Sequence, residues 1–415
     1  MSSDLFGLDS VLKIKKSGVR NVFTPHTPIN RFDHFFGREK DVKRMISLID
    51  SPGQHILLYG DRGVGKTSLA KTTCSFILNK INKGLFFTKS CDSEDIFSSL
   101  FLEPLQHIGC DTSVQSITKS LKQTGDASLN VVVAKGGLQS ERQSSTVFKN
   151  PANLNSPFWI ANQLKGLDCI FLLDEVDTLV NVEDKHKLAE LIKALSDLDS
   201  SFKIILVGIA KTASDLTAGH QSVQRCLKEI RLERMDDEDI RKIILNGMRQ
   251  IEKRPIDEVV DKIVNISSGF PHFAHLICLK CAEIAIETNK THIESEILDR
   301  ALDYAATDSE GTLTESVDAI LRTINKPQDY KLLLLAAANC QKRDFRSSEV
   351  TSKFKELFNI DITSAKLSKR LSKLTNEDVS NSILIKTGRG CFSFQDPRMP
   401  SFIKISFNNS RIIPA

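Results

Sequence analysis

The chain has 415 residues, of which 40% are hydrophobic and 26% are charged, a composition typical of globular proteins with about two to four domains at this length. No apolar run approaches the ~20 residues that cross a bilayer, and the first residues lack the basic and apolar regions of a secretory signal. These features disfavour membrane and secreted proteins. The 9 cysteines are scattered along the chain, as in a reducing compartment, and we expect a cytoplasmic protein.

Residues 1–27 are predicted to form an irregular N-terminal arm, because Pro25 and Pro28 interrupt any helix there. Between residues 28 and 228, short apolar segments alternate with segments of helical period. Strands are expected at 55–59, 85–88, 169–173 and 203–208, and helices at 41–50, 66–79, 92–105, 152–164 and 185–198. The apolar runs are continuous, which predicts a parallel sheet covered on both faces and hence a doubly wound α/β domain.

Three further segments complete the predicted organisation. Residues 112–150 are rich in Ser, Thr, Gln and Lys, and we expect a polar insertion, either a hairpin or a loop. Residues 229–307 have helical period throughout, which predicts an all-α lid. Residues 308–415 are predicted to form a winged helix-turn-helix, in which three helices precede a hairpin at 383–394.

The phosphate-loop (P-loop) pattern G-x-x-x-x-G-K-[ST] is matched at every fixed position by Gly60-Asp61-Arg62-Gly63-Val64-Gly65-Lys66-Thr67. The match lies between a predicted strand and a predicted helix. Its glycines allow backbone N–H groups to point at phosphate oxygens, and the helix N-terminus, with Ser68 in its first turn, adds partial positive charge. Lys66 is expected to reach the β- and γ-phosphates and Thr67 to coordinate Mg²⁺, which predicts a nucleoside triphosphate site.

A second motif ends a buried strand in two acids, Asp174 and Glu175. Packing gives no reason for carboxylates at this position. In a P-loop protein, the first acid orders a water on Mg²⁺ and the second polarises the attacking water, so we expect Asp174 to serve the metal and Glu175 to serve catalysis. Asp177 either assists or caps the next helix, and we expect the cap.

The identity of the nucleotide base is predicted from a motif that this sequence lacks. Guanine-specific P-loop proteins carry an Asn/Thr-Lys-x-Asp loop whose aspartate pairs with the base. The two candidates in this chain, at 88–91 and 289–292, both lack the aspartate. Adenine, and therefore ATP with Mg²⁺, is the expected ligand.

Three short segments carry a resemblance, of which the first is Phe36-Gly37-Arg38-Glu39. Together with the motifs above, they resemble the AAA+ ATPases of the origin-recognition/initiator type, which neighbour the STAND NTPases, and more narrowly a bacterial branch of ATP-binding proteins. The resemblance covers about residues 28–407. It implies that Phe36, Gly37 and Arg38 wrap the adenine.

The second segment is Ser222-Val223-Gln224-Arg225, similar to the part of AAA+ proteins that carries the arginine finger. The resemblance implies that Arg225 reaches the γ-phosphate held by a neighbouring subunit of a homo-oligomer. Such fingers contribute about 10³–10⁵ to the rate where they operate. The alternative for Arg225 is a surface salt bridge.

The third segment, Gly269-Phe270-Pro271-His272, opens a predicted helix with the Gly-x-Pro form of STAND proteins, where initiators have a sensor arginine. The resemblance implies that Pro271 packs near the adenine, while His272 either contacts phosphate or is structural. The strand at 203–208 departs from the family pattern too, because it should end in a polar first sensor and only Lys211 and Thr212 are candidates. The missing sensor arginine and the missing polar residue directly after the strand both favour slow hydrolysis that acts as a switch.

The C-terminal region is basic, with 16 Lys and Arg against 8 Asp and Glu from residue 326 onward. On the predicted recognition helix at 363–375, four basic residues share one face, namely Lys366, Lys369, Arg370 and Lys373. Together with the wing residue Arg389, they are the expected DNA contacts. Solvated basic faces and protein-binding winged helices are the alternatives. No Asn or Gln accompanies these residues to read bases, so we expect phosphate contacts with little sequence preference.

One pair of cysteines, Cys278 and Cys281, has the Cys-x-x-Cys spacing of metal sites. Only His275 lies one helical turn away, and a fourth ligand is lacking. We expect packing in a helix core rather than zinc.

These observations predict an ATP-hydrolysing AAA+/STAND-like switch that oligomerises with ATP and binds double-stranded DNA through its winged helix. Two alternatives remain open. The chain is either a STAND-like signalling or antiviral-defence ATPase whose winged helix binds a protein effector encoded nearby, or a DNA-targeting regulator of a transposase or nuclease.

Overall fold

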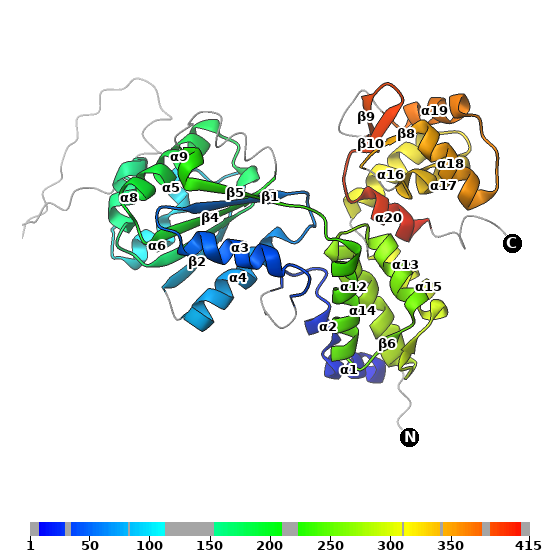
Figure 1. The fold of residues 1–415 in the computed structure, drawn as a ribbon, viewed down its shortest axis with the longest axis horizontal. Helices are drawn as coiled ribbons and strands as arrows, with labels where there is room; N and C mark the ends of the chain where they lie inside the picture. Colours follow the sequence, from blue (N-terminus) through cyan, green and yellow to red (C-terminus); the bar gives the residue numbers. More distant parts are fainter. Residues whose placement is uncertain are drawn as a thin grey trace, which may run out of the picture. The chain divides into compact units, whose positions relative to one another are not determined.

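The computed structural model describes residues 8–29, 35–81, 84–112, 153–209, 223–308, 311–340, 343–375 and 382–407. The chain divides into two compact units, which are described separately (Figure 1). The helical unit contains Met1–Met45, Tyr59–Asn79 and Arg231–Ala415. The sheet unit contains Ile46–Leu58 and Lys80–Ile230. None of the helices within the described ranges is long and apolar enough to cross a membrane.

The central sheet is parallel and has five strands in the order β2-β3-β4-β1-β5. Its strands are β1 (His55–Gly60), β2 (Leu85–Ser90), β3 (Cys169–Asp174), β4 (Phe202–Gly208) and β5 (Leu227–Leu232). Every residue of β3 is buried, as expected for a strand covered on both faces. The predicted parallel α/β fold and four of its strands are confirmed. The sequence pattern did not indicate β5, because Lys228, Glu229 and Arg231 interrupt its apolar residues and leave neither a continuous apolar run nor a regular alternation.

The helices of the sheet unit are short, except for α9 with its 16 residues. They are α5 (Phe97–Leu100), α6 (Leu102–His107), α8 (Pro157–Leu164), α9 (Val182–Asp197) and α11 (Val223–Cys226), with a 3-10 helix η2 (Val176–Thr178). Two of them replace the single helix predicted at 92–105. The carboxylate of Asp92 accepts the backbone N–H groups of Glu94 and Asp95, which favours a turn over helix at this point.

The helical unit contains α4 (Lys66–Ile81), α12 (Asp237–Gln250), α13 (Asp257–Ser267), α14 (Pro271–Glu287), α15 (Ser295–Thr307), and two short strands, β6 (Arg254–Pro255) and β7 (His292–Ile293). The helix α3 (Glu39–Asp50) crosses the boundary between the units. The region at 229–307 contains four helices, but it is not entirely α-helical, because β5 ends within it and β6 pairs with β7 in a two-stranded parallel sheet.

The N-terminal arm is not irregular, contrary to prediction, because residues before Pro25 form α1 (Leu8–Ser17) and α2 (Val19–Val22). The arm is fixed to the helical unit by its aromatic side chain. Phe23 is 1% exposed, and its ring lies 5.9 Å from that of His275 in an edge-on contact. A Cβ atom on Gly247 would lie 2.6 Å from the Phe23 ring, so a glycine in α12 permits this close approach.

The C-terminal elements are α16 (Gly311–Thr323), α17 (Pro327–Ala338), β8 (Asp344–Arg346), α18 (Ser347–Phe358), α19 (Ser364–Lys373), β9 (Leu384–Gly388), β10 (Cys391–Phe394) and α20 (Met399–Ser406). Their sheet is antiparallel in the order β8-β10-β9. The predicted hairpin turns at Gly388-Arg389-Gly390, where Gly390 has a φ of 70° that favours glycine. The short strand β8 and the helix α20 had no signal in the sequence pattern.

Candidate nucleotide-binding site

The P-loop turn runs from the end of β1 at Gly60 to the start of α4 at Lys66. Gly63 and Gly65 have φ values of 81° and 93°, which side chains other than glycine rarely adopt. A Cβ atom on Gly60 would lie 2.2 Å from the carbonyl oxygen of Leu232. The three glycines of the motif are therefore required by the backbone of this turn.

Lys66 lies across the turn that it follows. Its ammonium donates hydrogen bonds to the carbonyl oxygens of Gly60 at 3.1 Å and Asp61 at 2.9 Å. Thr67 and Ser68, next in α4, are partly exposed, and the Ser68 hydroxyl accepts the backbone N–H of Ile29 at 3.1 Å. The turn thus presents a glycine-rich backbone, an ammonium and the first hydroxyl of a helix N-terminus in one segment.

Arg38 joins the segment at 36–38 to the P-loop. Its guanidinium donates to the carbonyl oxygens of Val64 at 3.2 Å and Glu233 at 2.6 Å, and it pairs with Asp41 at 3.3 Å. Burial lowers the pKa of Arg38, and Asp41 partly opposes this shift. The neighbouring Gly37 is buried with a φ of 81°. The structure therefore joins Arg38 of this predicted segment to the P-loop.

The predicted Gly-x-Pro segment also adjoins the P-loop. A Cβ atom added to Gly65 would lie 3.7 Å from the side chain of Pro271, the first residue of α14. A Cβ atom added to Gly63 would lie 3.7 Å from the Phe270 ring. His272 instead contacts the N-terminal arm, since its Nδ1 lies 2.9 Å from the carbonyl oxygen of Pro25. Of the two roles expected for His272, phosphate contact and a structural role, the structural one has a specific partner in Pro25.

The two acids lie in the sheet unit at the end of β3. Asp174 is 7% exposed, and its carboxylate accepts the backbone N–H of Glu175 at 2.9 Å. Glu175 is exposed and has φ 56° and ψ 37°, a left-handed conformation that costs a non-glycine residue about 1–3 kcal/mol and is often found at functional sites. This backbone conformation turns the chain directly after the buried strand.

Ser90 was missed as a site residue by the sequence reasoning. It ends β2 in register with Asp174, and its hydroxyl donates to the Glu175 carboxylate at 2.9 Å. The segment at 88–91 was considered only for guanine recognition, although a polar residue at the end of a parallel strand was an available signal. Asp177 does not cap the following helix, contrary to expectation, because Asn181 caps α9 by accepting the N–H of Glu183.

Several predicted residues lie elsewhere or outside the described ranges. Arg225 lies in α11 of the sheet unit with an exposed side chain, and its carbonyl oxygen accepts from Gln54 at 3.3 Å. The first-sensor candidates Lys211 and Thr212, together with nearly all of the insertion at 112–150, fall outside the described residues.

No cluster of metal-ligating side chains is present among the residues that the structure describes. Cys278 and Cys281 are buried in α14, and burial raises the pKa of both thiols. Both side chains are fully buried within the helical unit.

Residues 56–234 match the model of the ATPase family associated with various cellular activities (AAA). This region contains the P-loop and both acids. The match identifies an AAA ATPase domain, and the enzymatic activity of the chain is ATP hydrolysis.

No curated protein matches the sequence significantly. Among solved structures, a Walker-type ATPase of Pyrococcus abyssi is similar with a TM-score of 0.50 and 18% identity, over 92% of this chain and 99% of that chain. The ORC2 protein of Aeropyrum pernix has a TM-score of 0.49 and 13% identity, over 94% and 97%. The ORC1 protein of that organism, in complex with DNA, has a TM-score of 0.45 and 16% identity, over 95% and 98%. The expected bacterial branch and STAND character stay predictions.

Proposed function

Because residues 56–234 are an AAA ATPase domain, we propose that the chain is an ATP-driven switch that oligomerises with ATP and binds double-stranded DNA. The observation that carries this proposal is the P-loop turn, with Lys66 on its own carbonyls and Arg38 and Pro271 beside it. The contacts of Arg38 and Pro271 with the P-loop support a role for their segments in binding the nucleotide base. The missing aspartate of the guanine motif favours ATP.

We propose that Thr67 and Asp174 each supply an oxygen ligand to a magnesium ion. Asp174 offers a buried carboxylate at the end of β3, and Thr67 offers a partly exposed hydroxyl in the first turn of α4. Oxygen donors of these two types, with substrate phosphates and water, are the ligands that Mg²⁺ prefers. Bound Mg²⁺ would neutralise charge on the phosphates. Lys66 would exchange its carbonyl contacts for phosphate oxygens, and Glu175, held by Ser90, would accept a proton from the attacking water.

Substituting Lys66 by Ala should raise the Kd for Mg-ATP on the order of 100-fold. A hydrogen bond to a charged group contributes about 1.5–3 kcal/mol, and the variant loses this contact to the phosphates. Calorimetric titration of both proteins measures the change. Lys80→Ala, at the exposed end of the same helix, is the matched control and should bind as the wild type does. Equal affinity of the Lys66→Ala variant and the wild type would refute the site.

The DNA-binding part of the proposal concerns residues 308–415. Their elements follow the winged-helix order, since α17, β8, α18 and α19 precede the hairpin of β9 and β10. Lys366, Lys369 and Lys373 are exposed on α19, and Arg389 is exposed at the hairpin tip. Arg370 differs from them, because it pairs with Asp329 at 2.7 Å and would leave this partner to reach a phosphate.

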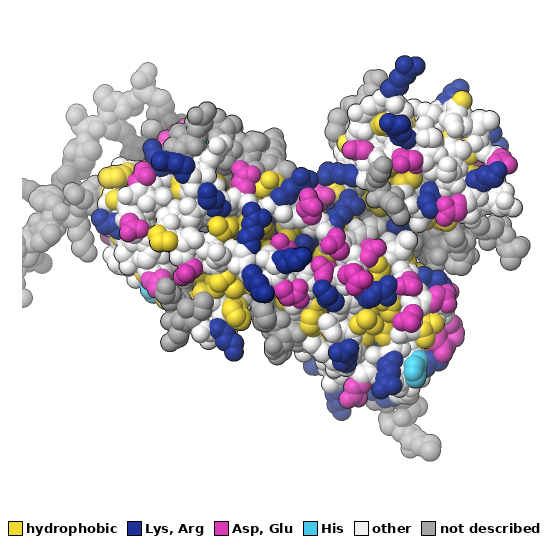
Figure 2. All heavy atoms as spheres, in the orientation of Figure 1, with side chains coloured by type: hydrophobic (Ala, Val, Ile, Leu, Met, Phe, Trp, Pro, Cys, Tyr) yellow, Lys and Arg dark blue, Asp and Glu magenta, His cyan; other side chains and the backbone are white. Residues whose placement is uncertain are grey.

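Charge on the visible surface does not form one large basic area. In Figure 2, dark-blue Lys and Arg side chains alternate with magenta Asp and Glu side chains. A small basic helix face with a basic wing tip therefore supports binding through several phosphates rather than through a broad electrostatic field.

Replacing Lys366 and Lys369 together by Ala should weaken binding to every duplex and reduce the log–log salt slope by about 2, because each neutralised phosphate contributes about 0.9 to that slope. Fluorescence anisotropy over a salt series, on two unrelated duplexes, measures both effects. The control replaces Lys353 and Lys355 on α18 by Ala and should leave the slope unchanged. Both lysines already form ion pairs, with Glu356 and Asp361 respectively. A wild-type affinity that does not depend on salt would reject DNA and favour a protein effector.

A further inference from the structure

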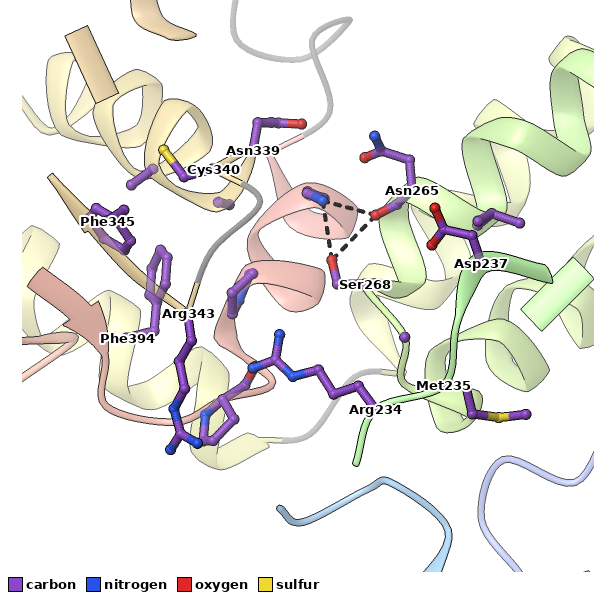
Figure 3. A pocket seen from close by; sticks show the side chains of 17 residues that line it. Arg234, Met235, Asp237, Asn265, Ser268, Asn339, Cys340, Arg343, Phe345 and Phe394 are labelled. Atoms are coloured by element: carbon purple, nitrogen blue, oxygen red, sulfur yellow. Dashed lines mark hydrogen bonds between the residues drawn. The ribbon is translucent and has the colours of Figure 1, made fainter. Parts of the chain in front are cut away.

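A cavity lies inside the helical unit, with a volume of about 390 Å³. Its walls come from the start of α12, the connection between α13 and α14, and the C-terminal elements α17, β8, β10 and α20. Figure 3 shows Phe345 and Phe394 side by side on one wall and Asn265 and Ser268 on another, with Arg234 and Arg343 between them. The volume falls in the range of about 300–1,000 Å³ that is usual for small-molecule sites.

The charge of the cavity is predominantly positive. Three cationic side chains line it, Arg234, Arg343 and Lys404, and Asp237 is the one carboxylate among the described lining residues. Cavities with several cations and few acids attract anions, because each buried cation is otherwise poorly solvated.

Lys404 is the cation with the fewest charged partners. Its ammonium donates to the carbonyl oxygen of Asn265 at 2.8 Å and to the Ser268 hydroxyl at 3.1 Å, both of them neutral groups (Figure 3). Its pKa is lowered to about 8, mainly by burial; Asp237 opposes this shift and Arg234 contributes to it. An anion in the cavity would stabilise this charge.

Arg234 and Arg343 share one carboxylate outside the cavity lining, that of Asp61 in the P-loop. Their guanidinium nitrogens lie 3.9 and 3.6 Å from the Asp61 oxygens, longer than the roughly 2.7–2.9 Å of strong charge-assisted bonds. Arg234 also stacks over the Phe270 ring at 4.6 Å. Its Nη2 also donates to the carbonyl oxygen of Pro397 at 3.2 Å. A guanidinium has five N–H donors, so both arginines retain donors that a second anion could use.

We propose that this cavity binds a small anion bearing phosphate groups, at a site separate from the P-loop nucleotide site. The forked donors of two arginines and the ammonium of Lys404 match a group with several oxygens and more than one negative charge, which a monocarboxylate would not offset. The anion would contact the α13–α14 connection and α20 together. Because the anion would share Arg234 and Arg343 with Asp61, its binding would also affect the ion pairs of this P-loop residue.

Inorganic pyrophosphate is the probe, titrated by calorimetry without divalent metal into the full-length Lys66→Ala variant, which weakens phosphate binding in the P-loop. We expect binding in this background. Adding Arg343→Gln should weaken it about 10- to 100-fold, because a donor to a charged group is lost. Arg343 is 57% exposed on its side chain, so this variant should fold. Lys404→Met should act in the same direction, and its thermal unfolding reports whether it is folded.

Two further variants distinguish the site from general electrostatics. Asp61→Asn in the same background should tighten pyrophosphate binding, since it frees both arginines from a competing carboxylate. Arg322→Met, an exposed arginine near the end of α16, should change nothing. The proposal is overturned by absence of pyrophosphate binding to the Lys66→Ala variant, or by equal weakening in the Arg322→Met and Arg343→Gln variants. Loss of the nucleotide site would leave these results unaffected, so the two proposals fail separately.

Discussion

Replacing Glu175 by Gln is expected to reduce ATP turnover about 10²- to 10⁴-fold while leaving the Kd for Mg-ATP nearly unchanged, because a positioned general base contributes about this factor to the rate. The amide keeps the shape of the side chain and its contact with Ser90 but cannot take a proton from water. Phosphate release at saturating ATP, with binding measured in parallel, separates the two quantities.

Two matched variants test this assignment. Asp177→Asn alters an exposed carboxylate in the adjacent 3-10 helix and should retain wild-type turnover. Ser90→Ala should lower kcat about fivefold with KM unchanged, as expected for a positioning residue that contributes one hydrogen bond of about 1 kcal/mol. If Asp177→Asn stopped turnover and Glu175→Gln did not, the base would be assigned to the wrong acid.

Substituting Arg225 by Ala is expected to lower turnover about 10³- to 10⁵-fold, the range observed for arginine fingers supplied by a neighbouring molecule. Its exposed side chain on α11 is accessible to a second copy of the chain. Nucleotide binding by the monomer should be unchanged, since Arg225 would contact only the γ-phosphate of another subunit.

Mixing variants tests whether Arg225 acts between subunits. The Arg225→Ala protein keeps Lys66, and the Lys66→Ala protein keeps Arg225, so hybrid assemblies should recover part of the activity that each lacks. Arg231→Ala, an exposed arginine on β5, is the control with wild-type turnover. A specific activity that stays constant on dilution far below any assembly threshold would contradict the role in trans.

Those parts of the fold that depend on local pattern could be predicted from the sequence. The P-loop, β1 to β4 and the C-terminal hairpin each follow from a contiguous run of residues, such as the apolar run of β3 with its terminal Asp174. The backbone of the turn then explains the motif glycines, since Gly63 and Gly65 adopt positive φ values.

Contacts between distant segments could not be predicted. The arm was expected to be irregular because its local sequence contains prolines, yet Phe23 is buried against His275 and Arg20 pairs with Glu283. Likewise, the basic face of α19 could be predicted from the helical spacing of its residues. The pairing of Arg370 with Asp329, however, depends on how α17 packs in the folded chain. Nothing in the local sequence around Arg234, Arg343 or Lys404 indicates that they line one cavity.

The switch itself is tested most directly by measuring the mass distribution of single molecules of the Glu175→Gln protein without nucleotide, with ADP and with Mg-ATP. This variant should hold ATP without hydrolysing it, so the ATP state is long-lived. The account predicts a higher-mass species with Mg-ATP that is lost on exchange to ADP and absent from the Lys66→Ala protein. The same mass distribution in all three conditions, with binding of both nucleotides confirmed by calorimetry, would contradict it.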